Sequence, residues 1–227
     1  MVGKFQPIDG LSFGRLRWRP CLVTCGLLFT LAVFFFAWSY PTFPGDREAL
    51  ERFQGIQTGW LDAAASAVTK LGWTPVSTGL ILVTVLALFV MRRWADALAV
   101  MLTGIPIGVG ILLKDVIGRP RPEYFLTNSM PSSLSFPSGH SIFAMLFGGL
   151  LIVLVEELPV STAIRRCLQA GLVVMILGVG ASRVYLGVHW PSDVVGGYLF
   201  GMMALVGLVW LRNRLTSSHR GAALASS

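Results

Sequence analysis

The sequence predicts an all-α polytopic membrane protein: six transmembrane helices in one bundle, with an interfacial helix on the outer side. Of the 227 residues, 54% are hydrophobic and only 13% are charged, and the mean hydropathy is +0.71. Several apolar runs also reach the roughly 18–20 residues that cross a bilayer as a helix. A soluble protein of this size could not bury so much apolar surface, so the composition excludes a soluble globule.

The first span is expected at 20–40, because a long apolar run ends there at Pro41. The polar and basic residues 1–19 are interpreted as a cytoplasmic N-terminal segment. Residues 46–70 mix charged side chains with regularly spaced apolar ones, which is typical of an amphipathic helix lying at the membrane interface. The stretch 41–70 is also a hypothesis for a lid or entry wall.

Five further spans follow from apolar runs bounded by arginines, prolines or polar residues: 74–91, 95–117, 139–155, 167–184 and 193–211. Pro106 is expected to kink the third span. The six-span domain therefore covers 20–211, and 212–227 is predicted to be a short disordered cytoplasmic tail. Two pairs of glycines spaced four apart are expected to let helices approach closely, namely Gly104 with Gly108 and Gly197 with Gly201.

The formal charge of +7 is spread over short basic clusters at the ends of apolar runs. This pattern is typical of topology signals and does not indicate a nucleic-acid-binding face. When the spans alternate sides, one side collects the N-terminal basic residues together with Arg92, Arg93, Arg165, Arg166, Arg212, Arg214 and Arg220. By the positive-inside rule this side is cytoplasmic. The outer side holds the mixed-charge segment 46–70 and four further cations that break the rule, which indicates that a function retains them: Lys114, Arg119, Arg121 and Arg183.

Polar residues gather in three islands that this topology brings to the outer face. The first runs from Lys114 to Pro122, the second is Pro137-Ser138-Gly139-His140, and the third runs from Ser182 to Asp193. A structural explanation exists for each: a lysine reaching toward the headgroups, a serine N-cap, and a loop histidine paired with a carboxylate. The functional interpretation is that the three islands build one phosphate site.

The residue types in these islands suit that chemistry. His189 and Asp193 are one helical turn apart, so the carboxylate can hold one ring nitrogen and leave the other free to act. Arg183 carries a planar fork that matches phosphate geometry. The start of the helix at Ser138 and Gly139 offers free backbone N–H groups to an anion, with His140 beside it as a titratable group.

The spacing Lys-x6-Arg-Pro, Pro-Ser-Gly-His and Ser-Arg-x5-His-x3-Asp resembles that of the type-2 phosphatidic acid phosphatase superfamily, and every signature position matches. The resemblance implies that His189 is a nucleophile that becomes a phosphohistidine, that Asp193 orients it, and that His140 is the general acid. It further implies phosphate-binding roles for Lys114, Arg121, Ser138, Gly139 and Arg183. Asp115, Arg119 and Glu123 could modulate the site. No metal or other cofactor is expected.

The expected function is that of a metal-independent lipid phosphatase acting at the extracytoplasmic side of the inner (plasma) membrane, with a membrane lipid phosphate as its partner. Undecaprenyl pyrophosphate is the first substrate that the resemblance suggests. Phosphatidylglycerophosphate, phosphatidic acid and lipid A are alternatives, because the motifs contact the phosphate and not the lipid. A lipid phosphotransferase and a non-enzymatic anion-binding membrane protein also stay open.

Overall fold

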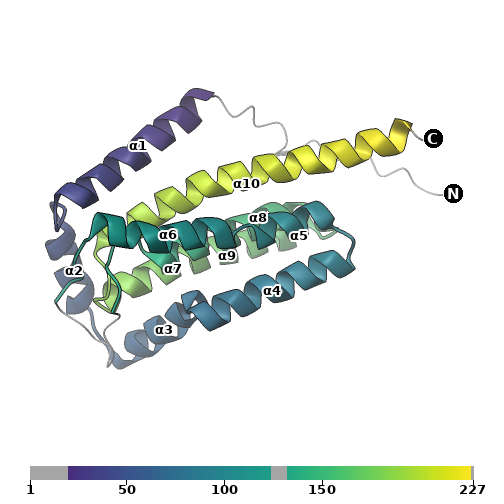
Figure 1. Ribbon diagram of the computed structural model, residues 1–227. Helices are drawn as coiled ribbons and strands as arrows, with labels where there is room; N and C mark the ends of the chain where they lie inside the picture. The colour runs from purple at the N-terminus through teal and green to yellow at the C-terminus, as the bar shows by residue number, and fades with distance from the viewer. Residues whose placement is uncertain (1–19, 124–131, 226–227) are drawn as a thin grey trace.

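The computed structural model describes residues 20–123 and 132–225, with side chains as far as Ser217. The described elements are all helical (Figure 1). They are α1 (Pro20–Ser39), α2 (Asp46–Gly55), α3 (Gly59–Thr69), η2 (Lys70–Gly72), α4 (Thr74–Val90), α5 (Trp94–Met101), α6 (Gly104–Ile117), α7 (Gly139–Phe143), η3 (Ala144–Gly148), α8 (Gly149–Glu156), α9 (Thr162–Tyr185) and α10 (Pro191–Ala225). The cytoplasmic segment expected at 1–19 lies outside the described residues.

Within the described ranges, five helical stretches are long and apolar enough to cross a bilayer: α1, α5 with α6, α7 through α8, α9, and the first part of α10. A sixth crossing arises if α3 and η2 are taken together with α4, to which they are joined at a bend of 55°. The prediction of an all-α membrane bundle is thus confirmed, with each expected span matched by a helix.

The third span is interrupted near the proline that was expected to kink it. Pro106 has no backbone N–H to donate to the carbonyl of Leu102 one turn earlier. That carbonyl instead accepts from Ile105, in a shorter turn that separates α5 from α6.

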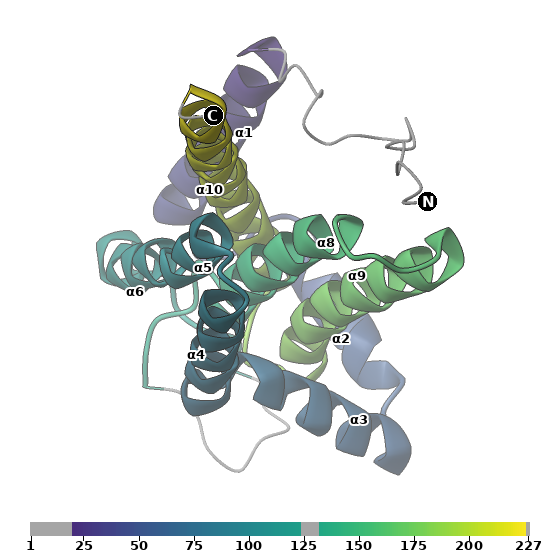
Figure 2. The ribbon, with the colours of Figure 1, turned by 90° about the vertical axis from the view of Figure 1, so that its right-hand side faces the viewer.

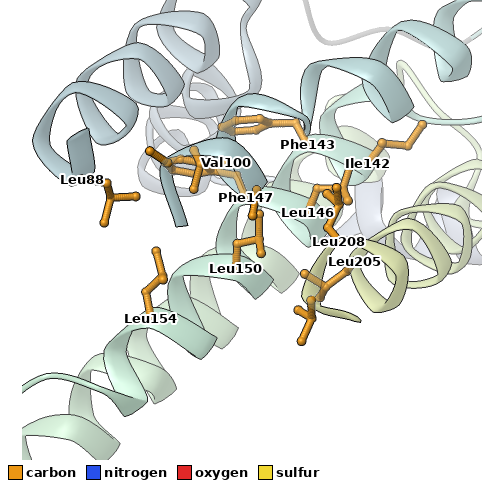
Figure 3. Close-up of a cluster of buried hydrophobic side chains, with 13 residues drawn as sticks. Leu88, Val100, Ile142, Phe143, Leu146, Phe147, Leu150, Leu154, Leu205 and Leu208 are labelled. Carbon is orange, nitrogen blue, oxygen red and sulfur yellow. The ribbon is translucent and has the colours of Figure 1, made fainter. Parts of the chain in front are cut away.

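The helix formed by α7, η3 and α8 is the centre of the bundle (Figure 2). Of its membrane-length window 61% is buried, against 11% for α1, which therefore lies at the periphery beside α10. Its apolar side chains form the main core with residues of α4, α5 and α10, including Leu88, Val100, Ile142, Leu146, Leu150 and Leu205 (Figure 3). This core positions the start of α7, where the second polar island begins.

One of the two expected glycine contacts is present and the other is not. A Cβ on Gly197 would lie 2.7 Å from the carbonyl oxygen of Ser138, so α10 packs directly on the start of α7. Gly104 and Gly108 have no atom within 4 Å of the same position, and the prediction for them was wrong. In α6 the close contact belongs to Gly110, where a Cβ would lie 2.5 Å from Ile142 Cδ1, because that face of α6 turns toward α7.

Two other expectations need correction. The single interfacial helix expected over 46–70 is two helices, since the chain turns at 56–58 between α2 and α3. The tail expected to be disordered from 212 onward is a continuation of α10 to Ala225. Arg212 is buried there and forms ion pairs with Asp96 (2.6 Å) and Glu157 (2.5 Å). These ion pairs lie at the end of the bundle away from the polar islands and stabilise the helix beyond 211.

Candidate active site

Six of the eight predicted site residues line one cavity of about 760 Å³: Lys114, Arg121, Gly139, His140, Arg183 and His189. The cavity lies where α6 and α9 end and α7 and α10 begin. These helix ends meet at one end of the bundle (Figure 1). Residues from all three polar islands therefore face a common space. Ser138 and Asp193 are fully buried behind its wall.

A tight turn after α9 delivers the histidine of the third island. Gly187 adopts φ 71°, the left-handed conformation that glycine favours just past a helix end. The N–H groups of Val188 and His189 then both donate to the carbonyl of Arg183 (3.2 and 3.3 Å). The chain is thereby folded back on α9, and His189 and Arg183 come to line the same cavity.

The His189 ring is held from both sides, which defines the role of each nitrogen. Nδ1 lies 3.3 Å from Asp193 Oδ2, and Nε2 lies 3.2 Å from Nη1 of Arg121. A guanidinium can only donate, so Nε2 accepts and the proton sits on Nδ1, facing the carboxylate. Nε2 is thus the nitrogen that carries the lone pair, as the spacing of His189 and Asp193 suggested, and Arg121 occupies that lone pair until a reacting atom takes its place.

Burial and the surrounding charge both favour the neutral form of the His189 imidazole. Burial lowers the pKa of His189 well below its ordinary value of 6.5, and the neighbouring cations Lys114, Arg121 and Arg183 lower it further. Burial likewise lowers the pKa of Arg121. A neutral imidazole is the form that can act as a nucleophile.

Lys114 and Arg183, two other predicted phosphate-binding residues, donate hydrogen bonds to protein oxygens. The Nζ atom of Lys114 donates to the carbonyls of Leu134 (2.8 Å) and Ser135 (3.2 Å). Arg183 donates from Nη1 to Thr69 Oγ1 (2.6 Å), whereas its Nε is buried without a partner among the described residues. An unpaired buried N–H is costly, and an anion in the cavity would satisfy it.

The start of α7 is arranged differently from the expectation for Ser138. Its hydroxyl caps the helix by accepting from the N–H of Ser141 (3.4 Å), and its own N–H donates to the carbonyl of Asp193 (3.0 Å). Its N–H is thus occupied and its side chain is buried, so Ser138 fixes α7 to α10 and does not line the cavity. Gly139 does line it, and space is open where its side chain would be.

Arg119, one of the three residues that the sequence suggested as modulators, contacts Asp193 directly. It is 1% exposed, and its Nη1 donates to Asp193 Oδ1 at 2.6 Å. Its Nη2 donates to Asp46 Oδ2 at 2.7 Å, from the first residue of α2. Asp46, absent from the prediction, is tied in turn to Ser192 (2.6 Å). Only the outer-side position of Arg119, contrary to the positive-inside rule, could have drawn attention to it.

The end of α3 and the turn after it also belong to the site, although the sequence analysis treated them only as a lid or wall. Ser66, Thr69, Lys70 and Trp73 line the cavity. A Cβ on Gly72 would lie 2.4 Å from Cδ2 of His140, so the backbone of η2 packs directly on that ring.

A neutral imidazole with an orienting carboxylate, ringed by cations and facing a cavity, suits attack on the phosphorus of an anionic ester. The family model described as PAP2 superfamily matches residues 80–217, more than half of the chain.

The chain belongs to the PAP2 superfamily. The phosphatidylglycerophosphatase B of Bacillus subtilis is 33% identical over 152 residues, which cover 65% of this chain and 73% of that protein. An undecaprenyl-diphosphatase of Sulfolobus acidocaldarius is 33% identical over 134 residues, covering 57% and 58%. This family assignment makes the chain an enzyme, a hydrolase of the lipid phosphatase class.

A solved PAP2 structure shares the architecture. The crystal structure of a transmembrane PAP2-type phosphatidylglycerolphosphate phosphatase from Bacillus subtilis superimposes with a TM-score of 0.75 at 27% identity, covering 85% of this chain and 96% of that one. The matched PAP2 range begins within α4, so α2, α3 and η2 lie outside it. Asp46, Thr69 and Gly72 therefore complete the PAP2 site from a part of the chain that the family model does not describe.

Proposed function

We propose that this PAP2 protein is a metal-independent membrane lipid phosphatase that works through a phosphohistidine at His189. The observation that carries the proposal is the buried His189–Asp193 pair, with Nε2 held by Arg121 at the wall of a cavity that also contains Lys114, Arg183 and His140. Undecaprenyl pyrophosphate is the proposed substrate. Phosphatidylglycerophosphate, phosphatidic acid and a lipid A phosphate are the alternatives that the assay below separates.

In the first step, Nε2 of His189 attacks the phosphorus and the bond from phosphorus to the leaving oxygen breaks. His140 gives its proton to that oxygen, and Asp193 stabilises the imidazolium that the transfer creates. In the second step, His140 takes a proton from a water molecule, which attacks the phosphorus. The N–P bond breaks, inorganic phosphate leaves, and His189 is neutral again.

The cations account for the remainder of the catalysis in this scheme. Phosphoryl transfer is accelerated mainly by positioning and by stabilising the charge on the phosphoryl oxygens. Arg121 and Arg183 are placed for this, and the unpaired Nε of Arg183 is a donor without a protein partner in the described chain. The expected position of the site is the extracytoplasmic side of the plasma membrane, because most basic residues outside the site, among them Arg92, Arg93 and Arg212, lie at the other end of the bundle.

The pH dependence of kcat/KM is expected to be bell-shaped, with the acid limb below pH 6.5. His189 must be neutral to attack, so activity is present above its pKa and is lost as the pH falls through it. Because burial and the neighbouring cations lower that pKa, the loss occurs at a lower pH than for an ordinary histidine. The basic limb reports loss of the proton that His140 donates. A profile that changes in one direction only across this range, with chemistry rate-limiting, would contradict these roles.

The substrate is tested by phosphate release from detergent-purified protein in EDTA. Undecaprenyl pyrophosphate, phosphatidylglycerophosphate, phosphatidic acid and lipid A 1-phosphate are compared side by side, with His189→Ala as the control. We expect metal-free release that depends on His189 and is fastest with undecaprenyl pyrophosphate. A different ranking would identify another lipid. Phosphate transfer to an added lipid or sugar hydroxyl, with little free phosphate, would indicate a phosphotransferase, and binding without turnover would indicate an anion-binding protein.

A further inference from the structure

The turn between α3 and α4 is fixed against the catalytic residues at two points. On one side Thr69 accepts a hydrogen bond of 2.6 Å from Arg183. On the other, the backbone at Gly72 touches the ring of His140, because a Cβ there would lie 2.4 Å from Cδ2. Lys70 follows Thr69 directly and precedes Gly72 by two residues, so its place next to the phosphate site is set from both sides.

Lys70 differs from the other cations that line the cavity because its ammonium group is not hydrogen-bonded to the described part of the protein. Lys114, Arg121 and Arg183 each donate to protein oxygens. The exposed side chain of Lys70 also lines the cavity, but its ammonium group makes no hydrogen bond or ion pair with any described residue. All three of its N–H donors are therefore available to a bound molecule.

The cavity has room for more than the phosphoryl group that is transferred. Its volume is about 760 Å³, whereas one water molecule in the liquid takes about 30 Å³. The three polar islands hold the part of the cavity next to His189 and His140. The wall formed by Ser66, Lys70 and Trp73 is left for the part of the substrate beyond that group.

We propose that Lys70 binds a second phosphate group of the substrate, next to the one that His189 attacks. This inference rests on the proposed lipid phosphatase function and narrows its substrate class to lipids with two phosphates. In a polyprenyl diphosphate the second phosphate is joined to the first through the bridging oxygen. In phosphatidylglycerophosphate it is a phosphodiester beyond a glycerol.

For a diphosphate, Lys70 would act on the leaving group. The N–P bond to His189 forms, the bond from phosphorus to the bridging oxygen breaks, and its electron pair goes to that oxygen, which takes the proton of His140 as the lipid monophosphate departs. A flexible lysine is a compact point charge that suits such a phosphate. Its attraction grows as the charge develops, so kcat as well as KM should depend on it.

The test compares Lys70→Met with the wild type at constant ionic strength, using undecaprenyl diphosphate, phosphatidylglycerophosphate and phosphatidic acid. We expect kcat/KM for the diphosphate to fall about tenfold, the worth of a hydrogen bond to a charged group. Phosphatidic acid, which has one phosphate, should change by less than about twofold. Lys70→Arg should keep most of the activity. Arg52→Met, which removes an exposed cation of α2 away from the cavity, should leave the three rates in their wild-type ratio.

A loss confined to phosphatidylglycerophosphate would support the subsite and identify the phosphodiester as its ligand. Equal losses on all three lipids, or no loss on any, would overturn the inference. Those results differ from failure of the proposed function itself: a wild type that hydrolyses none of the lipids in EDTA contradicts the phosphatase mechanism, whereas His189-dependent hydrolysis without discrimination by Lys70 contradicts only the subsite.

Discussion

With p-nitrophenyl phosphate as substrate, the His140→Asn enzyme is expected to release p-nitrophenolate in a burst stoichiometric with the enzyme. Its steady-state turnover after the burst should be about a hundred- to ten-thousandfold slower than that of the wild type. The reason is that p-nitrophenolate is a good leaving group and needs no proton from His140. The first step therefore proceeds, but hydrolysis of the phosphohistidine lacks its general base, and the intermediate accumulates.

The intermediate itself provides the decisive measurement. After incubation with a radiolabelled substrate, acid-labile phosphate should be recovered on His189 of the His140→Asn protein. His189→Gln should show neither burst nor label, although Lys114, Arg121 and Arg183 are still in place to bind the ester. A slow His140→Asn enzyme without burst or label would mean that water attacks the substrate directly, and the nucleophilic role of His189 would have to be abandoned.

Arg119→Met is expected to lower the free energy of unfolding by about 3–5 kcal/mol, which for a domain of this size corresponds to a fall in Tm of about 10 °C in detergent. The methionine removes the cation that pairs with both Asp46 and Asp193. Two carboxylates, both at most 3% exposed, are then left buried without their partner. Breaking a buried ion pair from one side is far more costly than replacing both partners. Thermal unfolding followed by tryptophan fluorescence measures the change.

Arg119 should also matter to catalysis, as a positioning residue. It holds Asp193 Oδ1, while Oδ2 of the same carboxylate faces His189 Nδ1 and accepts from the N–H of Trp190 at 2.8 Å. Without the guanidinium, the carboxylate can rotate away from the histidine. We therefore expect kcat of Arg119→Met to fall at least tenfold even at 10 °C, where the variant is folded, with KM less affected.

Asp46→Asn is the matched control. The amide oxygen can still accept from Arg119, and the ion pair from Arg119 to Asp193 stays intact, so a smaller loss of stability and nearly full kcat are expected. If Asp46→Asn and Arg119→Met reduced kcat in proportion to their loss of stability, Arg119 would be only a structural residue.

The catalytic motifs could be read from the sequence because each depends on residues that are near one another along the chain. The one-turn spacing of His189 and Asp193, and the start of a helix at Gly139, are local features that survive in the structure. Ser138 shows the limit of such reasoning. The same local pattern serves an N-cap and an anion-binding helix start, and only the carbonyl of Asp193, brought by α10, decided where its N–H points.

Arg119 and Arg121 show a second limit. Each precedes a proline in the same short stretch, yet one guanidinium is buried between Asp46 and Asp193 and the other faces the cavity. No pattern within the stretch distinguishes them. The difference arises because α2 supplies a carboxylate to one and the loop at 132–135 supplies carbonyl oxygens to the other.

The sequence by itself determined the class of protein, the approximate ends of the membrane helices, and the residues of the three motifs, because hydropathy, helix ends and motif spacing depend on neighbours along the chain. Only the tertiary structure decided that α2 and α3 are separate helices, that α10 continues beyond 211, and that Asp46, Thr69, Lys70 and Gly72 join the site. These features depend on which helix faces pack together. That choice is made by side-chain shape and buried charge between segments that are far apart in the chain.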